Sequence, residues 1–236
     1  MKARGFSLLE CLIGLGLSFL VVCACLQFFI AAEMSYFKLR DREERSQSAL
    51  AAMDKMRVDI LRAGQGLASE AALGLVEPAV ESSGVLLLTR AERDYVLAAD
   101  VASGDSQILL ASVAELKAGR EVIVSDGVSG EVLVISAVAP GAVGVAPPVS
   151  RPYKKEKALF RLLETVSLAL DARQGVIRRR TNGSAAQPLL ENVGAAGFVV
   201  DRVANLVRVR FSLTSQGDAT YELCLFPKNP ALAGKG

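Results

Sequence analysis

The 236-residue sequence contains no histidine and no tryptophan. Without histidine, the chain lacks the side chain that most often serves as a general base or a metal ligand near neutral pH. The sequence also has no glycine-rich phosphate loop, no Gly-x-Ser-x-Gly nucleophile motif and no cysteine cluster. These absences argue against an enzyme, and we expect no catalytic residues, no cofactor and no metal site.

Cysteine is scarce outside one region of the chain. Cys11, Cys23 and Cys25 fall within a single apolar run, which leaves Cys224 alone in the remainder. We expect Cys224 to pack as a small apolar residue rather than act as a nucleophile. Charge is nearly balanced at +2, with 27 Lys and Arg against 25 Asp and Glu, so no strong polyelectrolyte partner is implied.

The longest apolar stretch runs from Phe6 to Ala32, and Glu10 is its only charged residue. About 20 apolar residues in a helix span the hydrocarbon core of a bilayer, so this stretch is long enough to cross one. Residues 1–5 are short and basic, which favours a cytoplasmic N-terminus. A carboxylate inside such a stretch is costly and is usually retained because it has a partner.

The first residues after the initial methionine read Lys2-Ala3-Arg4-Gly5-Phe6-Ser7-Leu8-Leu9-Glu10. This run resembles the prepilin signature of type IV pilins and type II secretion pseudopilins. The resemblance implies cleavage between Gly5 and Phe6 by a prepilin peptidase and methylation of the new amino group of Phe6. It also implies that Glu10 neutralises the N-terminus of a neighbouring subunit in a filament. A buried charge is tolerable when it is paired, which agrees with that role.

Three other interpretations of the apolar stretch remain open. A plain signal anchor would share the basic start but would give no reason for Glu10. A secretory signal peptide would have a shorter apolar core and a small-residue cleavage site after it. Lipidation at Cys23 or Cys25 is the third, although the apolar run continues past both cysteines to Ala32.

Residues 33–64 predict a continuation of the same helix. They contain no proline and, before Gly64, no glycine. Apolar residues recur there every three or four positions, at Leu50, Met53, Met56, Ile60 and Leu61. This spacing is typical of an amphipathic helix, so we expect one helix over residues 6–63, about 85 Å long. The mixed charges of residues 38–45 predict a solvated helical face, with contacts between subunits as the alternative.

The predicted helix ends in Asp59-Ile60-Leu61-Arg62-Ala63-Gly64. This hexapeptide resembles the corresponding segment of PilW-like minor pilins and J-type minor pseudopilins; the alternative is an ordinary helix end capped by glycine. The order of residues 178–183, 187–193 and a closing strand pair again resembles the PilW-like group. Major pilins often carry a proline in the membrane half of the helix, and this chain has none there.

Short β-branched and leucine-rich runs follow Gly84. We expect strands at 85–89 and 95–98 joined by a turn at 91–94, and a hairpin of 121–125 with 131–135. Residues 103–153 are expected to close as a small barrel-like insertion. Asp94, Asp100, Asp105 and Asp126 are better explained as turn residues than as a calcium site, because no Asp-x-Asp-x-Asp-Gly loop is present.

Longer strands are predicted in the last third, at 158–170 and 176–180. Residues 206–213 and 220–225 alternate apolar with polar side chains, which predicts half-buried antiparallel strands that need a helix against their apolar face. The predicted class is therefore α+β with a pilin-like fold: a long N-terminal helix packed on an antiparallel sheet, within a β-rich head of residues 65–236.

One basic group raises the question of nucleic acid. It combines Lys154, Lys155 and Lys157 with the arginines at 178–180, but Tyr153 is the only aromatic residue among them. Alternation along a strand also sends Arg179 to the face opposite its neighbours. These basic residues are therefore better explained as ordinary surface charge than as a binding site for single-stranded nucleic acid.

The sequence and its resemblance together predict a minor pilin or pseudopilin that initiates, primes or caps a type IV pilus or a type II secretion pseudopilus. Such a subunit would span the inner membrane once and place its head in the periplasm. Expected partners are prepilin peptidase, other pilins or pseudopilins, and inner-membrane lipid before assembly. The alternatives are a signal-anchored periplasmic binding module with a β-rich ligand domain and a DNA-uptake pseudopilin.

Overall fold

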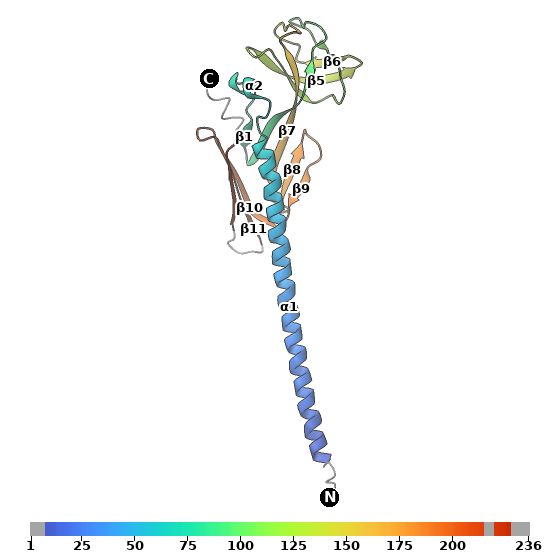
Figure 1. The fold of residues 1–236 in the computed structure, drawn as a ribbon, viewed down its shortest axis with the longest axis vertical. Helices are drawn as coiled ribbons and strands as arrows, with labels where there is room; N and C mark the ends of the chain where they lie inside the picture. Colours follow the sequence, from blue (N-terminus) through green and yellow to red (C-terminus); the bar gives the residue numbers. More distant parts are fainter. Residues whose placement is uncertain (1–7, 215–219, 228–236) are drawn as a thin grey trace. The chain divides into compact units, whose positions relative to one another are not determined.

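The computed structural model describes residues 8–214 and 220–227, which form one long helix followed by β-strands (Figure 1). Helix α1 (Leu8–Leu61) is 54 residues long. Strand pairing is antiparallel throughout the described chain. The predicted α+β class is therefore confirmed. The chain divides into two compact units, Met1–Leu50 and Ala51–Gly236, so that most of α1 belongs to the first unit and its last turns belong to the second.

The last turns of α1 are amphipathic, as predicted. Met56 and Ile60 are fully buried and Asp54 is exposed, but Leu50 and Leu61, which were predicted on the apolar face, are also exposed. The helix ends at Leu61, and Gly64, three residues later, adopts a positive φ of 73°. A glycine reaches this conformation without a steric cost, and its amide then donates to the carbonyl of Thr89 at 2.8 Å. A short helix that the sequence pattern did not predict, α2 (Ala68–Ala72), follows.

The described strands form a nine-stranded sheet and a three-stranded sheet. The larger one runs in the order β1-β2-β7-β4-β5-β6-β3, and β8 and β9 extend it from β7. The bounds of its members are β1 (Ala79–Ser82), β2 (Val85–Val96), β3 (Gln107–Leu109), β4 (Glu121–Ser125), β5 (Gly130–Ala139), β6 (Ala142–Ala146), β7 (Leu159–Asp171), β8 (Val176–Thr181) and β9 (Gln187–Leu190). The hairpin predicted around residues 126–130 is confirmed as β4 and β5.

The predicted turn at residues 91–94 is wrong, because β2 continues through it without a break. Its pairing with β7 shifts register by a bulge between Ala91 and Arg93 and then resumes. Asp94, one of the charged residues in that segment, instead bonds across the sheet to Arg161 of β7, and the preceding Arg90 bonds to Glu164 of the same strand. Opposite charges on paired strands stabilise a sheet, so this polar run is compatible with a strand.

Strands β3 to β6 close a small barrel with the adjoining halves of β2 and β7. Strand β7 pairs with β4 at its beginning and with β8 at its end. The barrel closes where Leu97 pairs with Leu110 in an isolated bridge. Its core of buried apolar side chains includes Tyr95, Ile108, Leu133, Val143, Tyr153 and Phe160. Residues 103–153 thus supply four of the strands, and β2 and β7 complete the barrel.

The three-stranded sheet comprises β10 (Val193–Asp201), β11 (Leu206–Leu213) and β12 (Thr220–Leu225). The predicted alternation of β11 is confirmed, since Val207, Val209 and Phe211 are buried while Arg208 and Arg210 are exposed. The expectation that Cys224 packs as a small apolar residue is wrong. Alternation along β12 turns Tyr221, Leu223 and Leu225 toward the half-buried side, so the thiol of Cys224 lies exposed opposite Arg208.

Candidate functional site

The N-terminal unit presents an apolar helical surface. Leu8 is 85% exposed and Phe28 is 78% exposed. This part of α1 is long and apolar enough to cross a membrane. Residues 8–32 would extend about 37 Å at 1.5 Å per residue, somewhat more than the hydrocarbon thickness of a bilayer. A membrane anchor joined to a β-rich head is therefore consistent with the fold.

Glu10 lies in the first turn of this helix. A carboxylate there interacts favourably with the positive end of the helix dipole, but it remains costly in an apolar environment unless a cation joins it. Gly5 and Phe6 lie outside the described residues, so cleavage and methylation stay predictions.

One other polar side chain of the apolar helix, Ser18, is satisfied within the helix. The hydroxyl of Ser18 donates to the carbonyl of Gly14 at 2.8 Å, a bond that needs no water. A side chain added at Gly14 or Gly16 would meet nothing within 4 Å, so both glycines leave space for close approach. Small residues of this kind let helices pack closely in lipid.

The head contains a buried ion pair that joins α1 to the nine-stranded sheet. Asp59, 3% exposed, accepts two bonds from the guanidinium of Arg179 on β8: Nε to Oδ2 at 2.7 Å and Nη2 to Oδ1 at 3.1 Å. The hydrogen bond to Asp59 raises the pKa of Arg179, so this guanidinium stays charged. Both segments stand out in the sequence, but no sequence signal indicates that they meet.

A second buried cluster was missed from the sequence. Glu70 of α2, 2% exposed, accepts bonds from Ser69 Oγ at 2.9 Å, Ser125 Oγ at 2.7 Å and Arg161 Nη1 at 2.8 Å. Arg161 also binds Asp94, and this hydrogen bond is the first cause of the raised pKa of Arg161. The cluster connects α2 to β2, β4 and β7. Its hydrogen bonds occupy the carboxylate of Glu70, so we interpret Glu70 as a structural residue rather than a reactive one.

The two halves of the basic group are separated. Arg180 pairs with Ser167, whereas the lysine group precedes Leu159 at the other end of β7. The rise of a strand puts Leu159 and Ser167 about 25 Å apart. Arg178 and Arg179 are also engaged with Asp171 and Asp59, respectively. The structure therefore shows no single basic surface made from both groups.

The four aspartates considered as calcium ligands each have a different protein partner. Asp94 binds Arg161, Asp100 binds Lys154, Asp105 accepts from the amide of Ala102, and Asp126 accepts from the amide of Ser129. In residues 8–214 and 220–227, no three His, Cys, Asp or Glu side chains come together as metal ligands.

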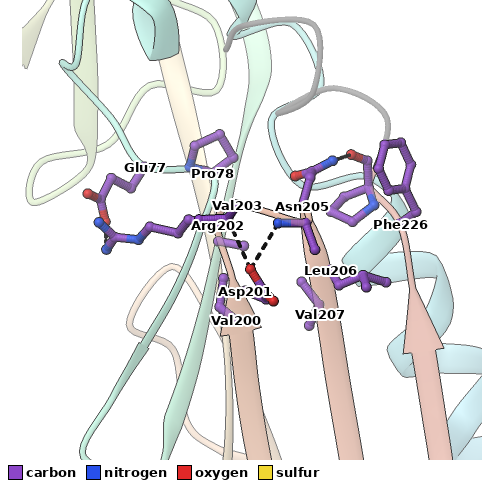
Figure 2. Close-up of a pocket in the computed structure, with 13 residues that line it drawn as sticks. Glu77, Pro78, Val200, Asp201, Arg202, Val203, Asn205, Leu206, Val207 and Phe226 are labelled. Carbon is purple, nitrogen blue, oxygen red and sulfur yellow. Dashed lines mark hydrogen bonds and ion pairs between the residues drawn. The ribbon is translucent and has the colours of Figure 1, made fainter.

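A pocket of about 390 Å³ lies where the β10–β11 turn meets the start of β1 and the chain after β12 (Figure 2). Pro78, Leu206 and Phe226 supply apolar surface. Its polar groups serve the fold: Arg202 pairs with Glu77, and Asn205 donates to the carbonyl of Pro227. The lining comes from three segments far apart in sequence, which is why sequence reasoning missed it. It holds no nucleophile beside a base.

No known protein family and no curated protein matches the sequence. Among solved structures, the chain is similar to the Gp54 tailspike of Acinetobacter baumannii bacteriophage AP22 in complex with A. baumannii capsular saccharide (12% identity, 33% of this chain, 15% of the tailspike, TM-score 0.29). It is also similar to the phage phi92 endosialidase (12% identity, 59% of this chain, 32% of the enzyme, TM-score 0.20). The chain thus spans at most a third of the length of either protein.

Proposed function

We propose that this protein is a minor pilin or minor pseudopilin with a pilin-like fold. It would be a structural subunit that initiates, primes or caps a type IV pilus or a type II secretion pseudopilus. The observation that carries the proposal is the position of Glu10, the only charge in the apolar run and a residue of the first described helical turn. A carboxylate inside an apolar stretch is tolerated when a cation pairs with it. The prepilin-like sequence around Glu10 implies that this cation is the N-terminal amino group of a neighbouring subunit.

In the proposed mechanism, prepilin peptidase cleaves after Gly5 and leaves Phe6 as a methylated N-terminus. Before assembly the subunit resides in the inner membrane, with residues 8–32 in lipid and the head in the periplasm. During assembly, Glu10 pairs with the amino group of an adjoining subunit as the apolar helices pack together. Because Glu10 is then neutralised, the helix can leave lipid for a filament core without an isolated buried charge.

A signal-anchored binding module is the second candidate, and the pocket in Figure 2 is the observation in its favour. A module of this kind would need the membrane helix only as a tether. Its function would require neither cleavage after Gly5 nor a cation that pairs with Glu10.

Mass spectrometry of the membrane-extracted protein separates the two candidates. A mature chain that starts at methylated Phe6 is expected for the assembly subunit. A chain that still starts at Met1, or one that carries lipid on Cys25, would rule that function out. A Glu10→Ala variant should be inserted and processed normally but enter filaments poorly. Glu33→Ala, which changes a carboxylate beyond the apolar run, is the matched control and should assemble normally.

A further inference from the structure

The barrel exposes an apolar surface next to a lysine-rich loop. Val96 of β2 is the cross-strand partner of Leu159 of β7, so both side chains lie on one face. The bridge between Leu97 and Leu110 turns those two leucines into the core and leaves the following Ala98 and the preceding Leu109 on the outer face. We call Val96, Ala98, Leu109 and Leu159 the barrel patch.

The barrel patch is accessible in the described chain. Val96 is 59% exposed, Leu109 47% and Leu159 39%, and Ala98 is also exposed. Isolated apolar side chains are common on protein surfaces, but a contiguous set on adjoining strands is typical of a surface that contacts a partner.

Lysines border this patch because of the strand pairing. Val101 pairs with Tyr153, and Val96 pairs with Leu159, so residues 154–158 lie opposite residues 97–100. The loop carries three lysines against Glu156, and Asp100 facing it is already bonded to Lys154 at 2.8 Å. Lys155 and Lys157 are exposed and take part in no ion pair among the described residues.

These charges define the chemistry of a partner. Ammonium groups beside an apolar surface are complementary to carboxylates that flank an apolar side chain. Nucleic acid fits less well, because Tyr95 and Tyr153 are buried in the barrel core and leave no exposed ring for base stacking here.

We propose that the barrel patch and the lysines at 155 and 157 form a docking surface for an acidic, leucine-containing segment of a partner protein. Apolar side chains of that segment cover Val96, Leu109 and Leu159, and its carboxylates meet the two lysines. The assignment of the partner as another assembly subunit rests on the proposed function; the docking chemistry itself does not.

Titration of the full-length chain in zwitterionic-lipid nanodiscs tests this proposal. The probe is a synthetic pentapeptide that alternates glutamate with leucine, and the readout is the methyl NMR signals of Val96, Leu109 and Leu159. Saturable shifts are expected, whereas a pentapeptide that alternates lysine with leucine should produce none. A Lys155→Glu/Lys157→Glu variant should bind about tenfold more weakly. The control Arg208→Glu/Arg210→Glu, on the three-stranded sheet, should bind within about twofold of the parent.

Three outcomes would overturn the proposal. The first is an absence of saturable shifts, and the second is equal binding of the two pentapeptides, which would indicate apolar adhesion alone. The third is a response of the same methyl signals to phosphatidylglycerol vesicles but not to the acidic peptide, which would assign the surface to lipid. The mass of the N-terminus is measured separately, so a chain correctly cleaved after Gly5 that ignores the peptide would refute the docking surface and leave the assembly function standing.

Discussion

The carboxylate of Asp59, on the last turns of α1, accepts hydrogen bonds from Nε and Nη2 on one edge of the Arg179 guanidinium of β8, 120 residues later in the chain. The side chain of Asp59 is 2% exposed and that of Arg179 is 18% exposed, so the pair is largely removed from water. Charges in such a position can fix the register of packed elements even where they add little net stability. In this head the pair fixes the end of the helix against one particular strand.

Removal of one member of this pair should be strongly destabilising. Arg179→Leu would leave the carboxylate of Asp59 buried without a counter-ion, and we expect the free energy of unfolding to fall by about 3–5 kcal/mol. The double variant Asp59→Leu/Arg179→Leu removes both charges and should recover most of that loss. Urea unfolding of the full-length chain in detergent, followed by near-ultraviolet circular dichroism, measures both values.

The exposed pair of Arg208 and Glu222 is a matched control for the buried one. Arg208→Leu should change the free energy of unfolding by less than about 1 kcal/mol, because water solvates both charges. If Arg179→Leu were no more costly than Arg208→Leu, the buried pair would not be holding the helix end.

Glu70 should matter in a similar way for α2. In a Glu70→Ala variant, Ser125 and Arg161 each lose an acceptor in a buried setting, and we expect a loss of about 3 kcal/mol. Asp94→Ala is the control, since Asp94 is half exposed and its removal leaves Arg161 bonded to Glu70. Hydrogen exchange of the α2 amides should rise only in the Glu70 variant. Equal exchange in the two variants would contradict the role assigned to Glu70.

The periodicity of apolar residues in the sequence predicted which faces of α1 and β11 are buried. The spacing of Met56 and Ile60 gave the buried face of α1, and the alternation of Val207 and Val209 gave the inward face of β11. Ion-pair partners that lie far apart in the chain were not predictable, because no local pattern around Asp59 indicates that it pairs with Arg179. The turn predicted at residues 91–94 failed for the same reason, since the acidic and basic partners of β2, Glu164 and Arg161, lie on β7, about 70 residues later in the chain. Glu10 was identified from sequence alone, and the partner proposed for it belongs to another chain.

Acidification should weaken the barrel through Asp126. Hydrogen bonds from the amides of Ser129 and Val128 lower the pKa of this carboxyl below its usual value. A carboxyl whose pKa is lower in the folded than in the unfolded state stabilises the fold at neutral pH. This stabilisation is lost as the pH falls below the ordinary aspartate pKa of about 4 and through the lower pKa of the folded state. An Asp126→Asn variant cannot titrate but can still accept both bonds, so its unfolding midpoint should fall less between pH 5 and pH 2 (roughly the range over which carboxyls protonate). Superimposable pH profiles for the variant and the parent would contradict this assignment.

The junction between the barrel and the segment after α2 should tolerate no side chain at Gly130. A Cβ built there would lie 2.6 Å from Leu75 Cδ1, 2.8 Å from Ser125 Cβ and 3.0 Å from the carbonyl oxygen of Val124. Leu75 could move, but the strand backbone of β4 cannot move without breaking its pairing, so Gly130→Ala should cost about 1–3 kcal/mol. Gly197 is also in a strand and has open space around it, so Gly197→Ala should be neutral or slightly stabilising. Thermal unfolding of the two variants side by side measures the contrast. An equal effect at both positions would mean that the cost reflects strand glycines in general and not close packing at Gly130.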